Sequence, residues 1–248
     1  MSLTARHLLL LGGTSDIGRA VAKHYADNGW QVTLAARDVE AASRNAADIN
    51  TRQPDAGVAV EGLDILETES FVSFLDALHP LPDTVVCVVG MLGDQEQAET
   101  DPDHATRIMR TNYEGPALFL DMIAARFVSR GYGMIIGVSS VAGDRGRASN
   151  YAYGSAKAGF TAFLSGLRNR LATKNVHVAT VKPGFVETRM TAGMDLPGAL
   201  TAKPKDVAER IAGIEIRPRD VIYVLPVWRL VMFVIRSIPE PIFKKLKL

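Results

Sequence analysis

Short apolar segments alternate along the chain with longer segments in which apolar residues recur at helical spacing. The apolar segments are typical of strands buried on both faces, and they cover residues 7–11, 32–36, 58–65, 85–89, 133–139, 177–181 and 221–224. Helical patterns cover residues 17–28, 71–78 and 103–130, a segment after Asp38, and a long segment that opens at 149–159. Strands separated by helices predict an α/β fold, with a doubly wound, mostly parallel sheet of about seven strands and helices on both faces.

Composition gives no reason to divide the chain. No linker, repeat or low-complexity segment separates two units, so residues 1–248 are expected to form a single domain. Hydrophobic residues make up 47% of the sequence, which argues against disorder, and the net charge of +1 gives no overall field that would attract nucleic acid. The single cysteine, Cys87, fits a reducing compartment, so we expect a cytoplasmic protein, and we expect no metal site.

Glycines follow the first predicted strand, in the loop that runs from Gly12 to Gly18. Glycine allows a tight turn and close approach of the backbone, and the helix that follows offers free N–H groups to a pyrophosphate. This position between strand and helix predicts a dinucleotide site, the alternative being a purely structural turn. Asp16 is unusual there, because a carboxylate repels a pyrophosphate unless it points away or accepts hydrogen bonds from the loop.

Tyr153 and Lys157 lie four positions apart at the start of a long predicted helix. Residues at this spacing share a helix face, whereas Tyr151 and Lys157 are six apart and do not. A phenol with a pKa of about 10 is a poor acid or base at neutral pH, and a nearby ammonium lowers that pKa. The pair therefore predicts a tyrosine that protonates a carbonyl oxygen as hydride arrives, although the spacing alone also fits a surface pair. Ser140 ends the fifth strand on the crevice side, and Ser139 then faces the other way.

The chain resembles the short-chain dehydrogenase/reductase family in four motifs within residues 11–188. These motifs are the glycine loop, an asparagine in the long helix before the fifth strand, the serine–tyrosine–lysine set, and a Pro-Gly turn after the sixth strand. The resemblance implies a Rossmann-type fold and a catalytic set of Asn112, Ser140, Tyr153 and Lys157. In the family the serine orients the carbonyl, the lysine also holds the cofactor ribose, and the asparagine holds a water that extends the proton relay. The resemblance therefore implies an NAD(P)(H)-dependent oxidoreductase that interconverts a ketone and a secondary alcohol.

The same resemblance implies a cofactor site along the carboxyl edge of the sheet. Besides Tyr153 and Lys157, the residues expected there are Gly12, Thr14, Ser15, Ile17, Gly18, Arg37, Asp64, Ile65, Gly90, Pro183, Gly184, Val186 and Thr188. The chain departs from the family twice. Asp16 stands at the middle glycine of the loop, and the usual Asn-Asn-Ala-Gly after the fourth strand is replaced by residues 88–91, Val-Val-Gly-Met.

Cofactor choice depends on the end of the second strand. An acid there binds the ribose 2′-OH of NAD, whereas an arginine accommodates the 2′-phosphate of NADP. The acid's position is occupied by Ala36 and followed by Arg37, which favours NADP(H) over NAD(H). Asp38 is the alternative: as a ribose ligand it would favour NAD(H), and otherwise it caps a helix.

Substrate and assembly are expected from resemblance alone. Residues 92–94 and 238–246 are similar to the branch of the family that reduces a decaprenylphosphoryl-2-keto-pentose (the erythro-pentulose form), which implies a keto-sugar carried on a polyprenyl phosphate. The alternatives are another ketone or alcohol (a steroid, an acyl chain or a free sugar) and a non-catalytic nucleotide sensor on the same fold. Family members are often dimers or tetramers, so a homo-oligomer is expected.

The C-terminal segment 227–248 is apolar and basic. It is too short and too interrupted by arginines to span a bilayer, but Arg229 and Arg236 share one helical face and suit an interfacial helix. Lys244, Lys245 and Lys247 would add attraction for anionic lipid. The segment is therefore expected to contact the inner face of the membrane, or to pack over the substrate pocket or a second subunit, and the two interpretations are compatible.

Overall fold

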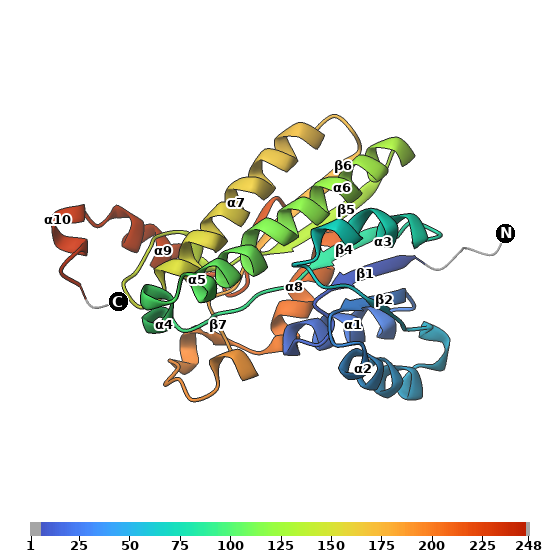
Figure 1. The fold of residues 1–248 in the computed structure, drawn as a ribbon, viewed down its shortest axis with the longest axis horizontal. Coiled ribbons are helices and arrows are strands. Elements are labelled where there is room, and N and C mark those ends of the chain that lie inside the picture. Colours follow the sequence, from blue (N-terminus) through green and yellow to red (C-terminus); the bar gives the residue numbers. More distant parts are fainter. Residues whose placement is uncertain (1–5, 247–248) are drawn as a thin grey trace.

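The computed structural model describes residues 6–246, and its centre is a seven-stranded parallel sheet (Figure 1). The strands are β1 (His7–Leu11), β2 (Gln31–Ala36), β3 (Ala59–Gly62), β4 (Thr84–Cys87), β5 (Gly133–Val138), β6 (Val176–Lys182) and β9 (Val221–Tyr223). Their order is β3-β2-β1-β4-β5-β6-β9, and every neighbouring pair is parallel. The strand order reverses between β1 and β4, and ligands bind such sheets at the carboxyl edge beside this switch point. The predicted doubly wound Rossmann-type fold is confirmed.

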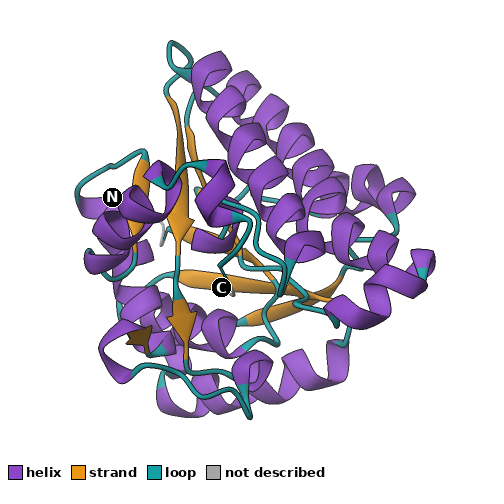
Figure 2. Cartoon of the chain, turned by 90° about the vertical axis from the view of Figure 1, so that its left-hand side faces the viewer, coloured by secondary structure: helices purple, strands orange, loops and turns teal. Residues whose placement is uncertain are grey.

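Helices cover both faces of the sheet. One face carries α1 (Asp16–Asp27), α2 (Val39–Arg52) and α8 (Pro204–Ile216), and the other carries α3 (Phe71–Ala77), α6 (Gly115–Arg130) and α7 (Tyr151–Leu171). Side chains alternate along a strand, so Leu8 and Leu10 of β1 pack toward the first set, whereas Leu9 and Leu11 pack toward the second. The long helices α6 and α7 run side by side in both views (Figures 1 and 2).

The segment predicted as one helix over 103–130 is interrupted. α5 (Pro102–Met109) and α6 are joined by a π-helical turn over Arg110–Glu114. Two strands also end earlier than predicted, β3 at Gly62 and β4 at Cys87, because the chain there leaves the sheet to form turns at the carboxyl edge. The remaining short elements are α4 (Gln95–Thr100), β7 (Phe185–Val186) paired with β8 (Thr201–Ala202), and the 3-10 turns Pro54–Ala56, Thr68–Ser70, Val141–Gly143, Arg189–Thr191 and Gly198–Leu200.

The C-terminal segment packs against the carboxyl edge as α9 (Val227–Ser237) and α10 (Glu240–Phe243). α9 buries Trp228 and Met232 in a small apolar cluster that includes Val141. Within residues 6–246, no helix is both long and apolar enough to cross a membrane. Lys247 and Leu248 of the predicted basic tail lie outside the described residues.

Candidate active site

Four side chains of the predicted catalytic set meet at the carboxyl edge of the sheet. Ser140 follows β5, Tyr153 and Lys157 lie one turn apart on α7, and Asn112 comes from the π-helical turn before α6. Asn112, Ser140 and Lys157 are buried, and Tyr153 is partly exposed. Gly90 lies between two of them: a Cβ there would be 3.1 Å from Asn112 Oδ1 and 3.4 Å from Lys157 Nζ. The sequence therefore predicts correctly which of these side chains come together.

The two serines after β5 face different ways. Ser139 Oγ lies 3.0 Å from the Lys157 carbonyl oxygen and 2.7 Å from Thr161 Oγ1, so this hydroxyl is committed to the backbone and side chains of α7. Ser140 Oγ accepts from the Ala142 amide at 3.1 Å, and Ser140 is close enough to Tyr153 to lower the pKa of the phenol. This geometry places only Ser140 beside the phenol, as expected.

The direction of the Tyr153 pKa shift differs from the sequence prediction. Burial raises the pKa of Tyr153, and its hydrogen bond with Ser140 lowers that pKa by less. Lys157 Nζ donates to the carbonyls of Val89 at 3.3 Å and Val138 at 3.2 Å, and it lies 5.9 Å from the centroid of the Tyr153 ring. Burial lowers the pKa of Lys157 to about 8. The expectation that Lys157 lowers the tyrosine's pKa is therefore wrong for this arrangement, because the ammonium is bound to strand carbonyls and the phenol is desolvated. Tyr153 is a neutral proton donor at neutral pH.

Asn112 braces the turn after β4. Its Oδ1 accepts from the Met91 amide at 3.2 Å, and its Nδ2 donates to the carbonyls of Met91 at 2.6 Å and Ile108 at 2.9 Å. This bracing serves the turn in which the family's asparagines are missing. π-helical turns widen a helix locally and are frequent at functional sites. The water-holding role of Asn112 stays a prediction, since its amide is engaged with the protein backbone.

The glycine loop packs closely on itself and on the turn after β4 only because its glycines lack side chains. Gly12 has a φ of +92°, and a Cβ there would lie 3.1 Å from the amide nitrogen of Val89. A Cβ at Gly18 would lie 2.4 Å from the Gly12 carbonyl oxygen. Ser15 caps α1 by accepting from the Gly18 amide at 2.9 Å and donating to the Gly12 carbonyl at 2.9 Å. A tight glycine turn at a helix N-terminus fits a pyrophosphate, and Ser15 holds its shape.

Asp16 and Arg189 join this loop to the segment after β7. Asp16 Oδ2 accepts from the Arg189 amide at 2.7 Å, and Oδ1 accepts from Arg189 Nε at 3.0 Å. Arg189 Nη2 also donates to the carbonyl of Thr14 at 2.7 Å. The unusual carboxylate is therefore paired with a cation. Sequence reasoning missed Arg189, because nothing in the local pattern connects positions 173 residues apart.

The predicted residues at the ends of β2 and β3 differ in whether their side chains are engaged within the protein. Asp38 Oδ1 accepts from the Ala41 amide at 2.9 Å and caps α2, as its helix-cap interpretation predicts. Arg37 is exposed and forms no hydrogen bond or ion pair with any residue in 6–246. Asp64 Oδ1 accepts from the Leu66 amide at 2.9 Å, and Ile65 is buried against α6. Arg37 is thus the unengaged group at the end of β2.

The Pro-Gly turn after β6 is shaped by the C-terminal helix. A Cβ at Gly184 would lie 1.9 Å from Trp228 Nε1, so Trp228 requires glycine there. Pro183 accepts from the Val141 amide at 2.9 Å. Val186 is buried in β7, and Thr188, two residues further on, forms a capping box at the 3-10 turn that begins with Arg189. Trp228 was not among the predicted site residues, since its role depends on a tertiary contact.

A buried ion pair lies beneath this turn. Lys182 Nζ pairs with Asp144 Oδ1, and the Tyr223 hydroxyl donates to Asp144 Oδ2 at 2.7 Å. Burial and the adjacent Asp144 raise the pKa of Tyr223 to about 12. The group ties the ends of β6 and β9 to the loop that follows Ser140.

Arg145, in the same loop, fastens the C-terminal helices. Its Nη1 donates to the carbonyls of Ile235 and Ile238, each at 2.6 Å, and its Nη2 donates to Glu240 Oε2 at 2.9 Å. The guanidinium also stacks over the Phe243 ring at 3.6 Å. The segment between Ser140 and Tyr153 is therefore attached to the junction of α9 and α10.

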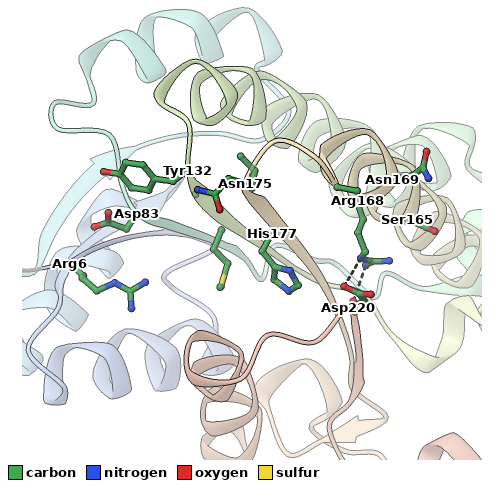
Figure 3. A pocket seen from close by; sticks show the side chains of 13 residues that line it. Arg6, Asp83, Tyr132, Ser165, Arg168, Asn169, Asn175, His177 and Asp220 are labelled. Atoms are coloured by element: carbon green, nitrogen blue, oxygen red, sulfur yellow. Dashed lines mark hydrogen bonds and ion pairs between the residues drawn. The ribbon is translucent and has the colours of Figure 1, made fainter.

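A cavity of about 930 Å³ opens at the opposite, amino edge of the sheet (Figure 3). Its charged groups are engaged within the protein: Arg168 Nη2 donates to Thr180 Oγ1 at 2.7 Å and to the Asp220 carbonyl at 2.8 Å, and Arg6 pairs with Glu215 at 2.8 Å. Ser140, Tyr153 and Lys157 lie at the other edge. We therefore place the candidate active site at the carboxyl edge.

Known proteins resemble this chain over most of its length. A family model described as short chain dehydrogenase matches residues 6–196. An uncharacterized oxidoreductase of Mycobacterium tuberculosis is 35% identical over 250 residues, covering 98% of this chain and 97% of that protein, and one of Streptomyces coelicolor is 36% identical over 247 residues, covering 97% and 96%. A 3-oxoacyl-[acyl-carrier-protein] reductase of Aquifex aeolicus is 29% identical and covers 77% of this chain and 78% of its own.

The fold is also that of solved structures. A short-chain dehydrogenase from Sphingobium yanoikuyae in complex with NADPH superposes with a TM-score of 0.81 at 21% identity, covering 95% of this chain and 97% of that one. The glycine loop, the side chains at the carboxyl edge and these relatives all indicate the same family. The chain belongs to the short-chain dehydrogenase family and is an NAD(P)-dependent oxidoreductase.

Proposed function

We propose that this protein reduces a ketone to a secondary alcohol at the carboxyl edge of the sheet, with residues 6–246 acting as one catalytic domain. The observation that carries the proposal is the placement of Ser140 and a partly exposed Tyr153 together at the carboxyl edge, with the buried Lys157 one helical turn from Tyr153. When bound, the nicotinamide cofactor supplies the hydride. Tyr153 donates its hydroxyl proton to the carbonyl oxygen, and Ser140 orients that oxygen.

Lys157 is proposed to resupply the proton that Tyr153 donates. Its Nζ is held by the carbonyls of Val89 and Val138, and burial lowers its pKa to about 8, so it can release or take up a proton near neutral pH. Asn112 keeps the adjacent turn at Met91 in place. We propose that these two residues complete the relay that returns a proton to Tyr153.

We propose NADP(H) as the preferred cofactor. Arg37 is exposed and unpaired among the described residues, whereas Asp38 is used as a helix cap. A free guanidinium at the end of β2 suits a 2′-phosphate. The NADPH complex of the Sphingobium yanoikuyae protein supports this preference by analogy.

We propose a lipid-linked keto-sugar as substrate, taken up at the surface of a membrane. The outer face of α9 is strongly apolar: Leu230 is 65% exposed and Phe233 is 69% exposed. Arg229 and Arg236 of α9 are exposed, as are Lys244 and Lys245 after α10. Apolar and basic groups on one exposed helix suit peripheral contact with anionic lipid. The inner face of the same helix packs over the Pro-Gly turn, so packing at the site leaves the outer face available for the proposed lipid contact.

Vesicle flotation tests the membrane contact. Leu230→Ser/Phe233→Ser should lose binding to anionic vesicles at low salt, while Val72→Ser, which alters an exposed residue on α3, should keep it. Deleting the whole segment would be a poor test, because Trp228 and Met232 belong to the core. Wild-type protein that stays in the soluble fraction contradicts the membrane proposal.

A substrate panel tests the reaction. NADPH consumption is followed with polyprenyl-phosphate keto-sugars, free keto-sugars, a steroid ketone and a 3-oxoacyl thioester, the last chosen because a relative carries the name of a 3-oxoacyl reductase. We expect the highest kcat/KM with the lipid-linked keto-sugar. A higher value with another ketone overturns the substrate, and cofactor binding without any turnover would favour a nucleotide sensor.

We propose a homo-oligomer that packs through α6 and α7. Leu118 on α6 is exposed on these long helices, as is Tyr113 in the π-helical turn before α6. Sedimentation velocity should give a mass above that of one 26.8 kDa chain, and Leu118→Glu should lower it. A wild-type monomer at micromolar concentration contradicts this proposal.

A further inference from the structure

Asp16 poses a question that the proposed reaction leaves unanswered. It stands in the loop that fits a pyrophosphate, at the position where the family has a glycine, and an unpaired carboxylate there would repel the phosphates. The structure pairs it with Arg189, whose amide and Nε both donate to the carboxylate. The repulsion is therefore cancelled by a residue from another part of the chain.

Arg189 is well placed to do more than neutralise a charge. Its Nη2 reaches the carbonyl of Thr14, inside the glycine loop, so the guanidinium spans two residues of that loop. Arg189 begins the 3-10 turn that follows Thr188, and β7 and β8 hold the start of this segment. The contact thus connects the end of the crevice that fits the pyrophosphate with the Pro-Gly side.

Each side of the contact is anchored independently. Asp16 is the first residue of α1, and Ser15 fixes the turn before it through two hydrogen bonds. On the other side, Thr188 and Thr191 form a capping box around Arg189. Since both ends are held by their own contacts, the backbone on each side brings Asp16 and Arg189 within hydrogen-bond distance of each other.

We propose that Asp16 and Arg189 form a clasp across the cofactor crevice, with Arg189 as a positioning residue for the cofactor pyrophosphate. The clasp has two consequences. With Arg189 present, the negative charge of Asp16 is paired, and three hydrogen bonds join Arg189 to the glycine loop. With Arg189 removed, Asp16 becomes a repulsive neighbour of the pyrophosphate. The harm of losing Arg189 should therefore depend on Asp16.

The test is a double-mutant cycle on NADPH affinity, measured by the change in NADPH fluorescence on binding to the full chain. Arg189→Gln should weaken NADPH binding by about tenfold, a change of about 1.4 kcal/mol. Asp16→Asn should leave affinity within about twofold of wild type, because it removes the repulsive charge while the asparagine Oδ1 can still accept from the Arg189 amide and Arg189 Nη2 can still donate to the Thr14 carbonyl. Asp16→Asn/Arg189→Gln should recover most of the loss caused by Arg189→Gln. Arg52→Gln, an exposed ion-paired arginine at the end of α2, is the matched control and should change nothing.

Two results overturn the clasp. One is an Arg189→Gln affinity equal to wild type, and the other is a double variant that binds as weakly as Arg189→Gln. Thermal melts without NADPH verify that each variant is folded, and if Arg189→Gln is not, the equally uncharged Arg189→Met replaces it in the cycle. The inference rests on the dinucleotide site of the proposed function. Failure of that site would show as no NADPH binding by wild type, whereas failure of the clasp leaves wild-type binding intact.

Discussion

Replacing Lys182 by methionine tests the buried ion pair beneath the Pro-Gly turn. The side chains of Lys182 and Asp144 are only 9% and 3% exposed. Methionine keeps the length of the lysine stem, so the change removes a charge without opening a large cavity. Removing one partner of a buried pair costs about 3–5 kcal/mol, because the other charge stays desolvated.

The structure places the cost near the lower end of that range. Tyr223 still donates to Asp144 Oδ2 at 2.7 Å, and the positive charge of Arg147 acts on the same carboxylate. We expect Lys182→Met to lower the free energy of unfolding by about 3 kcal/mol. Asp144→Asn in the Lys182→Met background removes the unpaired charge and should recover about half of the loss.

The assay is urea denaturation at pH 7, followed by circular dichroism, with Lys205→Met as the matched control. Lys205 and Glu209 are 81% and 51% exposed at 3.6 Å, so breaking this pair should cost less than about 0.5 kcal/mol. Equal losses for Lys182→Met and Lys205→Met would refute the reasoning. So would a Lys182→Met loss below about 1 kcal/mol.

Three further predictions concern the site. Tyr153→Phe should leave less than about a tenth of the wild-type kcat in the NADPH assay, with NADPH affinity little changed; a larger residual rate contradicts its role as proton donor. Arg37→Ala should weaken NADPH binding by about tenfold more than NADH binding in fluorescence titrations, and equal losses would contradict the cofactor preference. Burial lowers the pKa of Lys157 from 10.5 to about 8, so between these pH values the unfolded chain binds more protons than the folded one. The free-energy cost of burying the Lys157 ammonium is therefore present below about pH 8 and is lost as pH rises toward 10.5. The stability of wild type relative to Lys157→Met should therefore increase by about 3 kcal/mol across this window, and a flat or falling difference in urea titrations would show that Lys157 is not desolvated.

The strands and most helices could be predicted from the sequence, because apolar periodicity reports directly on burial. The turn at 110–114 could not, since an amphipathic pattern continues through a π-helical turn without a break. Asn112 was predicted from its family position, but its bracing of Met91 depends on a turn from a different strand.

The candidate site divides in the same way. The one-turn spacing of Tyr153 and Lys157 is a local property of a helix, and it was correct. The pKa of Tyr153 depends on desolvation and on where the lysine's protons are bound, which is why its predicted direction was wrong. Arg189 and Trp228 act through contacts with Asp16 and Gly184, distant in the sequence, and no local signal marks them.

The attachment of Arg145 to the α9–α10 junction has a thermodynamic consequence. The loop that carries Arg145 also connects Ser140 to Tyr153, so the same loop contacts both the active site and the C-terminal helices. Coupling between two binding events is reciprocal. Under the proposed membrane contact, any factor by which a lipid surface raises substrate affinity through this loop is the factor by which bound substrate raises the affinity of the protein for that surface. The protein would then stay bound longer to membranes that carry the proposed substrate.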